Sequence, residues 1–240
     1  MNKNKNGVWT SWNDNISSNY ESLYKITSEQ ELQEIVKKSE KIRVFGNKQS
    51  SADIASGVAT LVDMRTYNQV IHFNESAKTI TVQSGIILGD LLEIIESKDW
   101  CIPCLPDINT ITIGGALATG THGTSGKLLS EYVINFRMVL ADGAIKTITE
   151  KDNLINAVRV SLGALGVLSE ITFQCEPLYT LHIKEGPEDD TLWLPKIKER
   201  LQNHDFLRIL WLPHTDKGYV IIGDKIDSNT VIKEDLGPSY

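Results

Sequence analysis

The first part of the chain alternates stretches with a hydrophobic period of two and stretches with a period near 3.6. A period of two predicts a strand with one buried face, and residues 79–83 show it clearly. A period near 3.6 predicts an amphipathic helix, as in the stretch that follows the capping box at 28–31. The predicted strands are 42–45, 60–63, 69–73, 79–83, 132–140, 144–148 and 167–175, and the predicted helices lie around 32–36, 88–95 and 154–158. Because hairpins outnumber regular β-α-β units, the fold class that this pattern predicts is α+β.

The pattern changes near residue 178. An acidic break is predicted at 185–190, followed by one helix around 194–201 and two strands near 207–212 and 219–223. Two strands and one helix bury little apolar surface for an independent core.

We therefore predict a first domain over residues 1–177, which opens at Trp9 after a polar tail. Residues 178–240 are expected to be the beginning of a second, truncated domain. Its last part, 226–240, is polar and shows no period.

The stretch 106–126 (PDINTITIGGALATGTHGTSG), called here the glycine-rich stretch, has an unusual composition. Its five glycines are interleaved with threonines and a serine, and no charged residue follows Asp107. Such a segment offers backbone N–H groups and small hydroxyls to a large anion, and a diphosphate is the obvious candidate. Apolar residues within it, such as Ile113 and Leu117, tie it to a core and argue against a flexible linker.

Two further loops of small residues adjoin strands. The first loop, 46–51, follows the strand 42–45, and the third loop, 161–166, precedes the strand 167–175. Each alone is typical of an ordinary strand-to-loop turn. Taken together with 112–123, they predict one extended cleft lined by backbone and long enough for a dinucleotide.

Charge and hydropathy exclude several kinds of partner. The 240-residue chain has a net charge of −7, and its lysines and arginines are scattered, which argues against binding to nucleic acid or to an anionic membrane surface. Its apolar runs are too short to span a bilayer, and the N-terminal residues lack the apolar stretch of a signal peptide. We expect a cytoplasmic protein and leave membrane association open.

Other chemistries find little support in the sequence. Cys101 and Cys104 form a C-x-x-C without a second pair or a histidine at zinc-like spacing, so buried thiols are expected. The five histidines are dispersed, and no metal site is predicted. There is no G-x-S-x-G elbow of a hydrolase and no G-x-G-x-x-G of a Rossmann fold.

Four segments in chain order resemble the FAD-binding, PCMH-type domain of the vanillyl-alcohol-oxidase superfamily. Within it, the resemblance is closest to L-gulonolactone, other sugar-1,4-lactone and alditol oxidases. The segments are 43–54 (RVFGNKQSSADI), 112–123 with its T-G-T-H-G end, 161–167 (SLGALGV) and 210–215 (LWLPHT). The resemblance runs from about Trp9 to about Gly223. It implies a two-subdomain FAD-binding fold followed by the start of an α+β substrate (cap) domain.

The resemblance also implies site residues. The implied cofactor-binding residues are Val44, Phe45, Gly46, Asn47, Lys48, Gln49 and Ser50 around the diphosphate; Thr112, Gly115, Thr119, Gly120, Thr121 and His122 along the diphosphate and isoalloxazine; and Val167 on the adenine or ribose side. His122 is expected to fix its loop by hydrogen bonds rather than act as a base. Cys104 falls near a substrate-side position that carries serine in relatives. Ala116 and Ala118 are candidates for a residue that gates oxygen.

Gln49 departs from the family pattern. Many relatives carry at this position a histidine that is linked covalently to the flavin, and a carboxamide cannot form that link. The implied FAD is therefore non-covalent. The family's catalytic residues lie beyond residue 240, so none is assigned here.

The function that the resemblance implies is an FAD-dependent oxidoreductase acting on CH–OH groups of a sugar lactone or polyol. A hydride would pass from the C–H beside the hydroxyl to flavin N5, and dioxygen or another acceptor would reoxidise the flavin. One alternative is a truncated or split flavin-binding fragment without turnover, whose partner would be a missing C-terminal half. Another is a reductase of the UDP-N-acetylenolpyruvylglucosamine type, against which the W-x-P-H-T segment counts.

Overall fold

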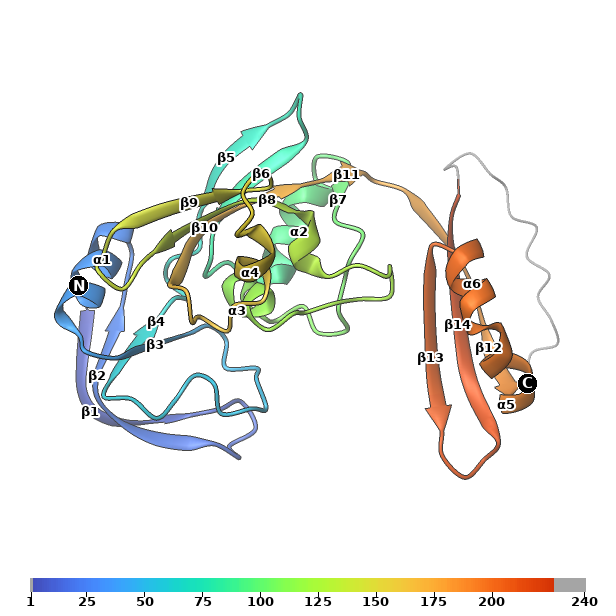
Figure 1. The fold of residues 1–240 in the computed structure, drawn as a ribbon, viewed down its shortest axis with the longest axis horizontal. Coiled ribbons are helices and arrows are strands. Elements are labelled where there is room, and N and C mark those ends of the chain that lie inside the picture. The colour runs from blue at the N-terminus through green and yellow to red at the C-terminus, as the bar shows by residue number, and fades with distance from the viewer. Residues whose placement is uncertain (1, 227–240) are drawn as a thin grey trace. The chain divides into compact units, whose positions relative to one another are not determined.

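The computed structural model describes residues 2–226, which form two compact units (Figure 1). As far as it describes them, the first unit comprises 2–123 and 127–176, and the second comprises 124–126 and 177–226. Helices and strands are mixed in both units, which confirms the predicted α+β class. Residues 227–240 of the predicted polar tail lie outside the described part.

The first unit contains a four-stranded sheet with the order β1-β2-β4-β3, called here the N-terminal sheet. Its elements are β1 (Asn2–Thr10), β2 (Ser17–Lys25), α1 (Glu29–Lys38), β3 (Ile42–Phe45) and β4 (Thr60–Asp63). Strand β4 runs parallel to both β2 and β3. The predicted cap begins α1, because the Ser28 hydroxyl accepts the N–H of Glu31 at 3.2 Å. The apolar stripe of α1 packs with buried Val62 and Met64.

The polar tail predicted before Trp9 was wrong, because these residues form strand β1. It pairs with β2 in antiparallel register from Asn2↔Lys25 to Thr10↔Ser17. Most β1 side chains are exposed, and only Trp9 is buried. The strand is stabilised by main-chain hydrogen bonds at a sheet edge, so it carries no hydrophobic alternation that a sequence pattern could reveal.

A second sheet of the first unit, called the central sheet, is antiparallel throughout and has the order β5-β6-β10-β8-β9. Its strands are β5 (Val70–Asn74), β6 (Thr79–Gln83), β8 (Val133–Val139), β9 (Ile145–Thr149) and β10 (Val167–Gln174). Both predicted hairpins are confirmed. Helices α2 (Leu88–Glu96), α3 (Ile113–Ala118) and α4 (Ile155–Arg159) lie together on one side of this sheet in Figure 1, and their apolar residues share its core.

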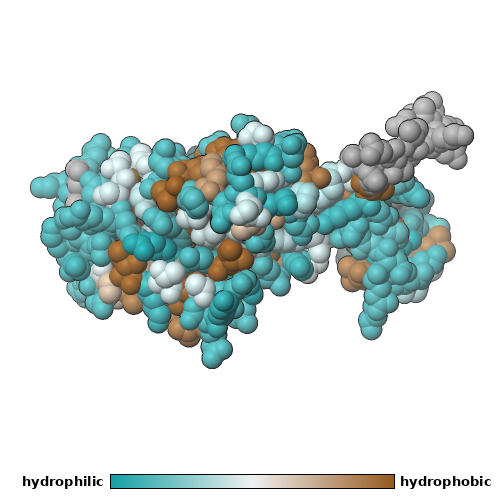
Figure 2. Space-filling model, turned by 90° about the horizontal axis from the view of Figure 1, so that it is seen from above, coloured by the Kyte–Doolittle hydropathy of each residue, from teal (hydrophilic) through white to brown (hydrophobic). Residues whose placement is uncertain are grey.

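Shorter elements complete the first unit. They are β7 (Trp100–Cys101), the 3-10 turn η1 (Leu129–Tyr132) and β11 (Glu176–Pro177) at the boundary of the unit. Within residues 2–226, no helix is both long and apolar enough to cross a membrane. On the face seen in Figure 2, hydrophobic residues form small patches separated by hydrophilic ones.

The second unit is a three-stranded antiparallel sheet of order β12-β14-β13 with short helices. Its elements are β12 (Thr180–Asp189), α5 (Asp190–Trp193), η2 (Leu194–Lys196), α6 (Ile197–Asn203), β13 (Phe206–Leu212) and β14 (Lys217–Ile226). Trp193 packs tightly on β14, because a Cβ built on Gly218 would lie 2.7 Å from its Nε1. The indole Nε1–H also donates to Asp190 Oδ1 at 2.8 Å.

The acidic break predicted at 185–190 was wrong, because residues 185–189 belong to β12 and Asp190 opens α5. The carboxylates are compatible with a strand at the edge of the sheet, where side chains reach solvent or a partner. Glu188, for example, pairs with Arg200 of α6 at 2.8 Å. Charge clusters indicate solvent contact and do not by themselves interrupt main-chain pairing.

Candidate functional site

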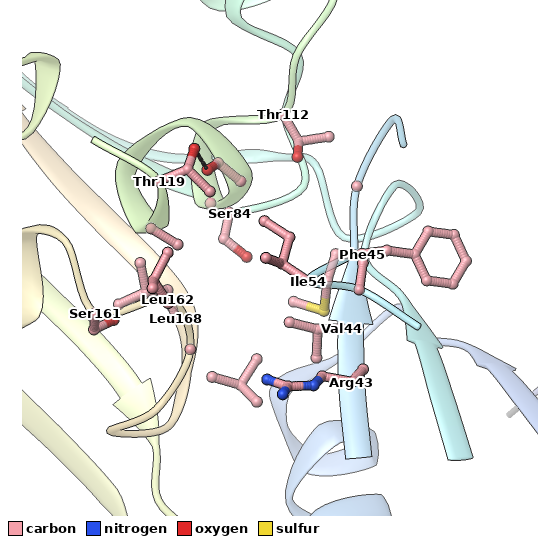
Figure 3. A pocket seen from close by; sticks show the side chains of 18 of the residues that line it. Arg43, Val44, Phe45, Ile54, Ser84, Thr112, Thr119, Ser161, Leu162 and Leu168 are labelled. Carbon is pink, nitrogen blue, oxygen red and sulfur yellow. Dashed lines mark hydrogen bonds between the residues drawn. The ribbon is translucent and has the colours of Figure 1, made fainter. Parts of the chain in front are cut away.

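A cavity of about 520 Å³ lies inside the first unit. Its walls come from the end of β3 with the first loop, the glycine-rich stretch with α3, the turn between β8 and β9, and the third loop (Figure 3). The three small-residue loops are far apart in the sequence. They meet here because each loop adjoins one end of a strand or helix, and these ends border the cavity: the end of β3, the start of α3 and the start of β10.

The cavity gathers most of the residues that the sequence analysis assigned to a cofactor. Those that line it are Val44, Phe45, Gly46, Asn47, Lys48, Gln49, Ser50, Thr112, Gly115, Thr119, Thr121 and Val167. Ala116 and Ala118, the candidate gate residues, also line it.

Three predicted residues lie elsewhere. Gly120 does not line the cavity and takes a positive φ of 70°. His122 is exposed, with its ring Nδ1 3.1 Å from the carbonyl oxygen of Gly123 in its own loop. Cys104 is fully buried in the core, where its Sγ–H donates to the carbonyl of Lys127 at 3.3 Å.

The first loop and the glycine-rich stretch are in direct contact. Gly46 faces Thr112 so closely that a Cβ built on Gly46 would overlap the Thr112 hydroxyl and lie 2.7 Å from its Cβ and Cγ2. Two amide side chains of the first loop add hydrogen bonds to Thr110. Asn47 Nδ2 donates to the Thr110 carbonyl at 2.7 Å, and Gln49 Nε2 donates to its hydroxyl at 3.2 Å. Only glycine permits this approach at position 46.

Lys48 sets the path of the first loop. Its φ of 61° lies in the left-handed region, and its carbonyl accepts the N–H of Trp12 at 3.2 Å. Its ammonium group lies 5.5 Å from the Trp9 ring centre and 5.7 Å from the Phe45 ring centre. Burial lowers the pKa of Lys48, and the nearby Arg65 guanidinium lowers it further. The cation is thus held by an aromatic pair.

Several backbone donors along the cavity have no acceptor among residues 2–226. Within residues 2–226, no hydrogen bond uses the N–H groups of residues 46–49. At the start of α3, Ile113 and Gly114 donate to the carbonyls of Ile86 and Ser84, whereas Gly115 N–H donates to no described residue. Free N–H groups at a loop and at a helix start suit an anionic ligand.

Two buried hydroxyls complete the donor set. Ser84 is 2% exposed and Ser161 is 8% exposed; both line the cavity, and neither hydroxyl has a hydrogen-bond partner among the described residues (Figure 3). Sequence reasoning placed Ser161 in the third loop but missed Ser84, because a serine at the end of β6 belongs to no motif. Together with the free N–H groups, these hydroxyls fit a ligand rich in acceptors, as a diphosphate is.

Helix α1 and the central sheet are joined by a partly buried ion pair. Arg137 of β8 donates to both carboxylate oxygens of Glu29 on α1, with Nη2 2.8 Å from Oε2, and Ser169 Oγ donates to Glu29 Oε1 at 2.6 Å. Burial raises the pKa of Glu29, but the hydrogen bonds from Arg137 and Ser169 outweigh it, so the pKa is lowered overall. The pair fixes α1 to the central sheet.

Comparison with known families matches both parts of the chain. Residues 21–149 match the family described as "FAD binding domain", and residues 171–238 match "D-arabinono-1,4-lactone oxidase". L-gulonolactone oxidase from Mus musculus is 29% identical over 221 residues, which cover 89% of this chain and 50% of the relative. L-gulono-1,4-lactone dehydrogenase from Mycobacterium tuberculosis is 30% identical over 216 residues, which cover 88% and 50%. The chain thus spans about half the length of these curated relatives.

A solved structure supports the same fold. Cholesterol oxidase from B. sterolicum superposes with a TM-score of 0.78 at 18% identity, covering 92% of this chain and 47% of that chain. The family match over more than half of the chain, together with this architecture, agrees with the resemblance drawn from the four motifs. The chain belongs to the FAD binding domain family, within the PCMH-type FAD-binding superfamily.

Proposed function

We propose that the chain is the cofactor-binding part, with the start of the substrate domain, of an FAD-dependent oxidoreductase that acts on CH–OH groups of a sugar lactone or polyol. Dioxygen or another acceptor would take the electrons. The observation that carries the proposal is the order of the two family matches, FAD binding domain first and lactone oxidase second. Residues 1–177 would form the FAD-binding domain, and 178–240 would begin the substrate domain.

The residues of the cavity fit FAD. The free N–H groups of 46–49 and of Gly115 would bind the diphosphate, with Ser84 and Ser161 as further donors. The apolar side chains of Val167 and Leu168 would pack against the adenosine part. When bound, the flavin supplies the two-electron redox chemistry, while the protein supplies binding, orientation and electrostatics.

Gln49 supports non-covalent binding. Its amide is not a nucleophile, and the Nε2 group is already hydrogen-bonded to the Thr110 hydroxyl. The side chain therefore acts in holding the first loop against the glycine-rich stretch. We expect acid precipitation of the yellow protein to release the flavin into the supernatant; colour retained in the pellet would contradict this assignment.

The function is tested by anaerobic titration of the FAD-loaded chain with L-gulono-1,4-lactone, D-arabinono-1,4-lactone and a polyol such as xylitol. Bleaching of the flavin absorbance by one of them would support oxidoreductase activity, and readmission of oxygen would show whether dioxygen is the acceptor. FAD uptake without bleaching by any compound would favour the alternative, a flavin-binding fragment without turnover. Adding the C-terminal half of a relative as a separate polypeptide would then test for rescue.

A further inference from the structure

Both backbone hydrogen-bonding groups of Ser84 have partners, whereas its side-chain hydroxyl has none among residues 2–226. Its N–H donates to the carbonyl of Ser169 on β10 at 2.8 Å, and its carbonyl accepts the N–H of Gly114 at 2.8 Å. These bonds fix the residue between the central sheet and α3. The hydroxyl is buried, lacks a partner among residues 2–226, and points into the space between α3 and β3 in Figure 3.

A hydroxyl in this place is unfavourable unless something accepts its hydrogen bond. A buried polar group without a partner destabilises a protein, and most such groups in folded proteins are satisfied. Val44 and Ile54, which line the same cavity, are apolar and offer no acceptor, and Met64 offers only a weakly accepting thioether. Ser130 is as deeply buried and also lacks a partner, but Ser84 in addition lines the cavity, so a ligand bound there can accept its hydrogen bond.

Gly114 packs closely against Ser84. A Cβ built on Gly114 would lie 3.0 Å from Ser84 Cβ, 3.1 Å from its carbonyl oxygen and 3.5 Å from its Oγ. A larger residue at 114 would therefore press on Ser84 and displace it. Ser84 also lies beside α3, whose Gly115 N–H is one of the free backbone donors. The hydroxyl and this N–H are thus two donors that line the same cavity.

We propose that the Ser84 hydroxyl donates a hydrogen bond to the diphosphate of bound FAD and thereby sets cofactor affinity. The proposal rests on the proposed FAD binding. Among the parts of the dinucleotide, the diphosphate has the highest density of acceptor oxygens and carries the negative charge, and hydrogen bonds to ionised acceptors are about twice as strong as neutral ones.

The test compares S84A with S130A in the full chain. Ser130 is the matched control, because it is 1% exposed and its hydroxyl also lacks a partner, but it does not line the cavity. Dissociation constants are measured for FAD by quenching of flavin fluorescence, and for ADP, which carries the diphosphate without a flavin, by competition. We expect S84A to bind both about tenfold more weakly, and S130A to bind both like the wild type.

Thermal unfolding without ligand provides a second readout. S84A is expected to melt no lower than the wild type, because it removes an unsatisfied buried hydroxyl and adds no atoms. S84C, whose thiol is somewhat larger than the hydroxyl and a weak donor, should lose affinity almost as far as S84A.

Several results would overturn the proposal. They are unchanged affinity of S84A for FAD, a loss for FAD but none for ADP, or an equal loss in S130A. Failure of the wild-type chain to take up FAD would instead overturn the proposed function itself, so the two failures are distinguishable.

Discussion

Gly46→Ala tests whether the contact between the first loop and the glycine-rich stretch stabilises the site. The added methyl group would overlap the Thr112 hydroxyl and lie 2.7 Å from its Cβ and Cγ2. Because Cβ does not move when a side chain changes rotamer, Thr112 cannot relieve the overlap by rotation alone. The end of β3 must therefore move away from α3.

The expected magnitude follows from overpacking in a closely packed site, which destabilises by about 1–3 kcal/mol. Thr112 is 3% exposed, and its carbonyl accepts the N–H of Ala116 at 2.9 Å, so it has little room to shift. We therefore expect about 3 kcal/mol, the upper end of the range. With a urea m-value of roughly 3 kcal/mol/M, the unfolding midpoint would fall by roughly 1 M. FAD affinity should also fall, since the free N–H groups of the first loop are displaced.

Urea unfolding, followed by tryptophan fluorescence and by FAD uptake, checks this prediction. Gly186→Ala is the matched control, because a Cβ built there meets nothing within 4 Å and its φ is not in the left-handed region. The double variant G46A/T112G removes the colliding side chain and should recover more than half of the loss. If G46A unfolds at the wild-type midpoint and binds FAD normally, the inferred contact is not a constraint on the fold.

Three further predictions concern the ion pair, the thiols and the second unit. Glu29→Ala should destabilise the chain by about 1–3 kcal/mol at neutral pH. This figure is discounted because the Arg137 side chain is 36% exposed and keeps Glu170 Oε2 at 3.9 Å from its Nε. In the folded protein the pKa of Glu29 lies below its ordinary value of 4.5. The stabilisation by the ion pair is therefore present above pH 4.5 and is lost as the pH falls through the pKa that Glu29 has in the folded protein. The urea midpoints of the wild type and E29A should consequently converge in acid. Burial and the nearby Cys101 raise the pKa of Cys175 to about 12, so iodoacetamide at pH 8 should modify Cys175 only after denaturation, as mass spectrometry would show. Gly218→Ala should lower the melting temperature of the second unit through its contact with Trp193 and leave FAD affinity unchanged; a change in affinity would contradict this assignment.

The elements that could be predicted from the sequence are those that bury an apolar face of side chains. The hairpin of β5 and β6 and the helix α1 bury an apolar face, and that face produces a readable period. Strands β1 and β12 are stabilised mainly by main-chain pairing, so their polar sequences gave no signal. Helix α3 was also missed, because its first N–H groups are taken by the carbonyls of Ile86 and Ser84, which lie far away in the sequence.

For the candidate site too, some residues could be recognised from the sequence, whereas their contacts could be found only in the structure. Small residues such as Gly46 and Gly115 could be recognised from the sequence, because a loop that approaches an anion by its backbone needs them. The reason for each glycine, however, depends on which segment lies opposite. Gly46 accommodates Thr112, whereas Gly114 leaves room for Ser84. The sequence therefore indicates which backbone segments lack side chains. Only the structure shows that Gly46 lies against Thr112 and Gly114 against Ser84. A side chain at position 46 should consequently push the first loop away from Thr112, whereas one at position 114 should press on Ser84, whose Cβ and carbonyl oxygen lie 3.0 and 3.1 Å from the added Cβ.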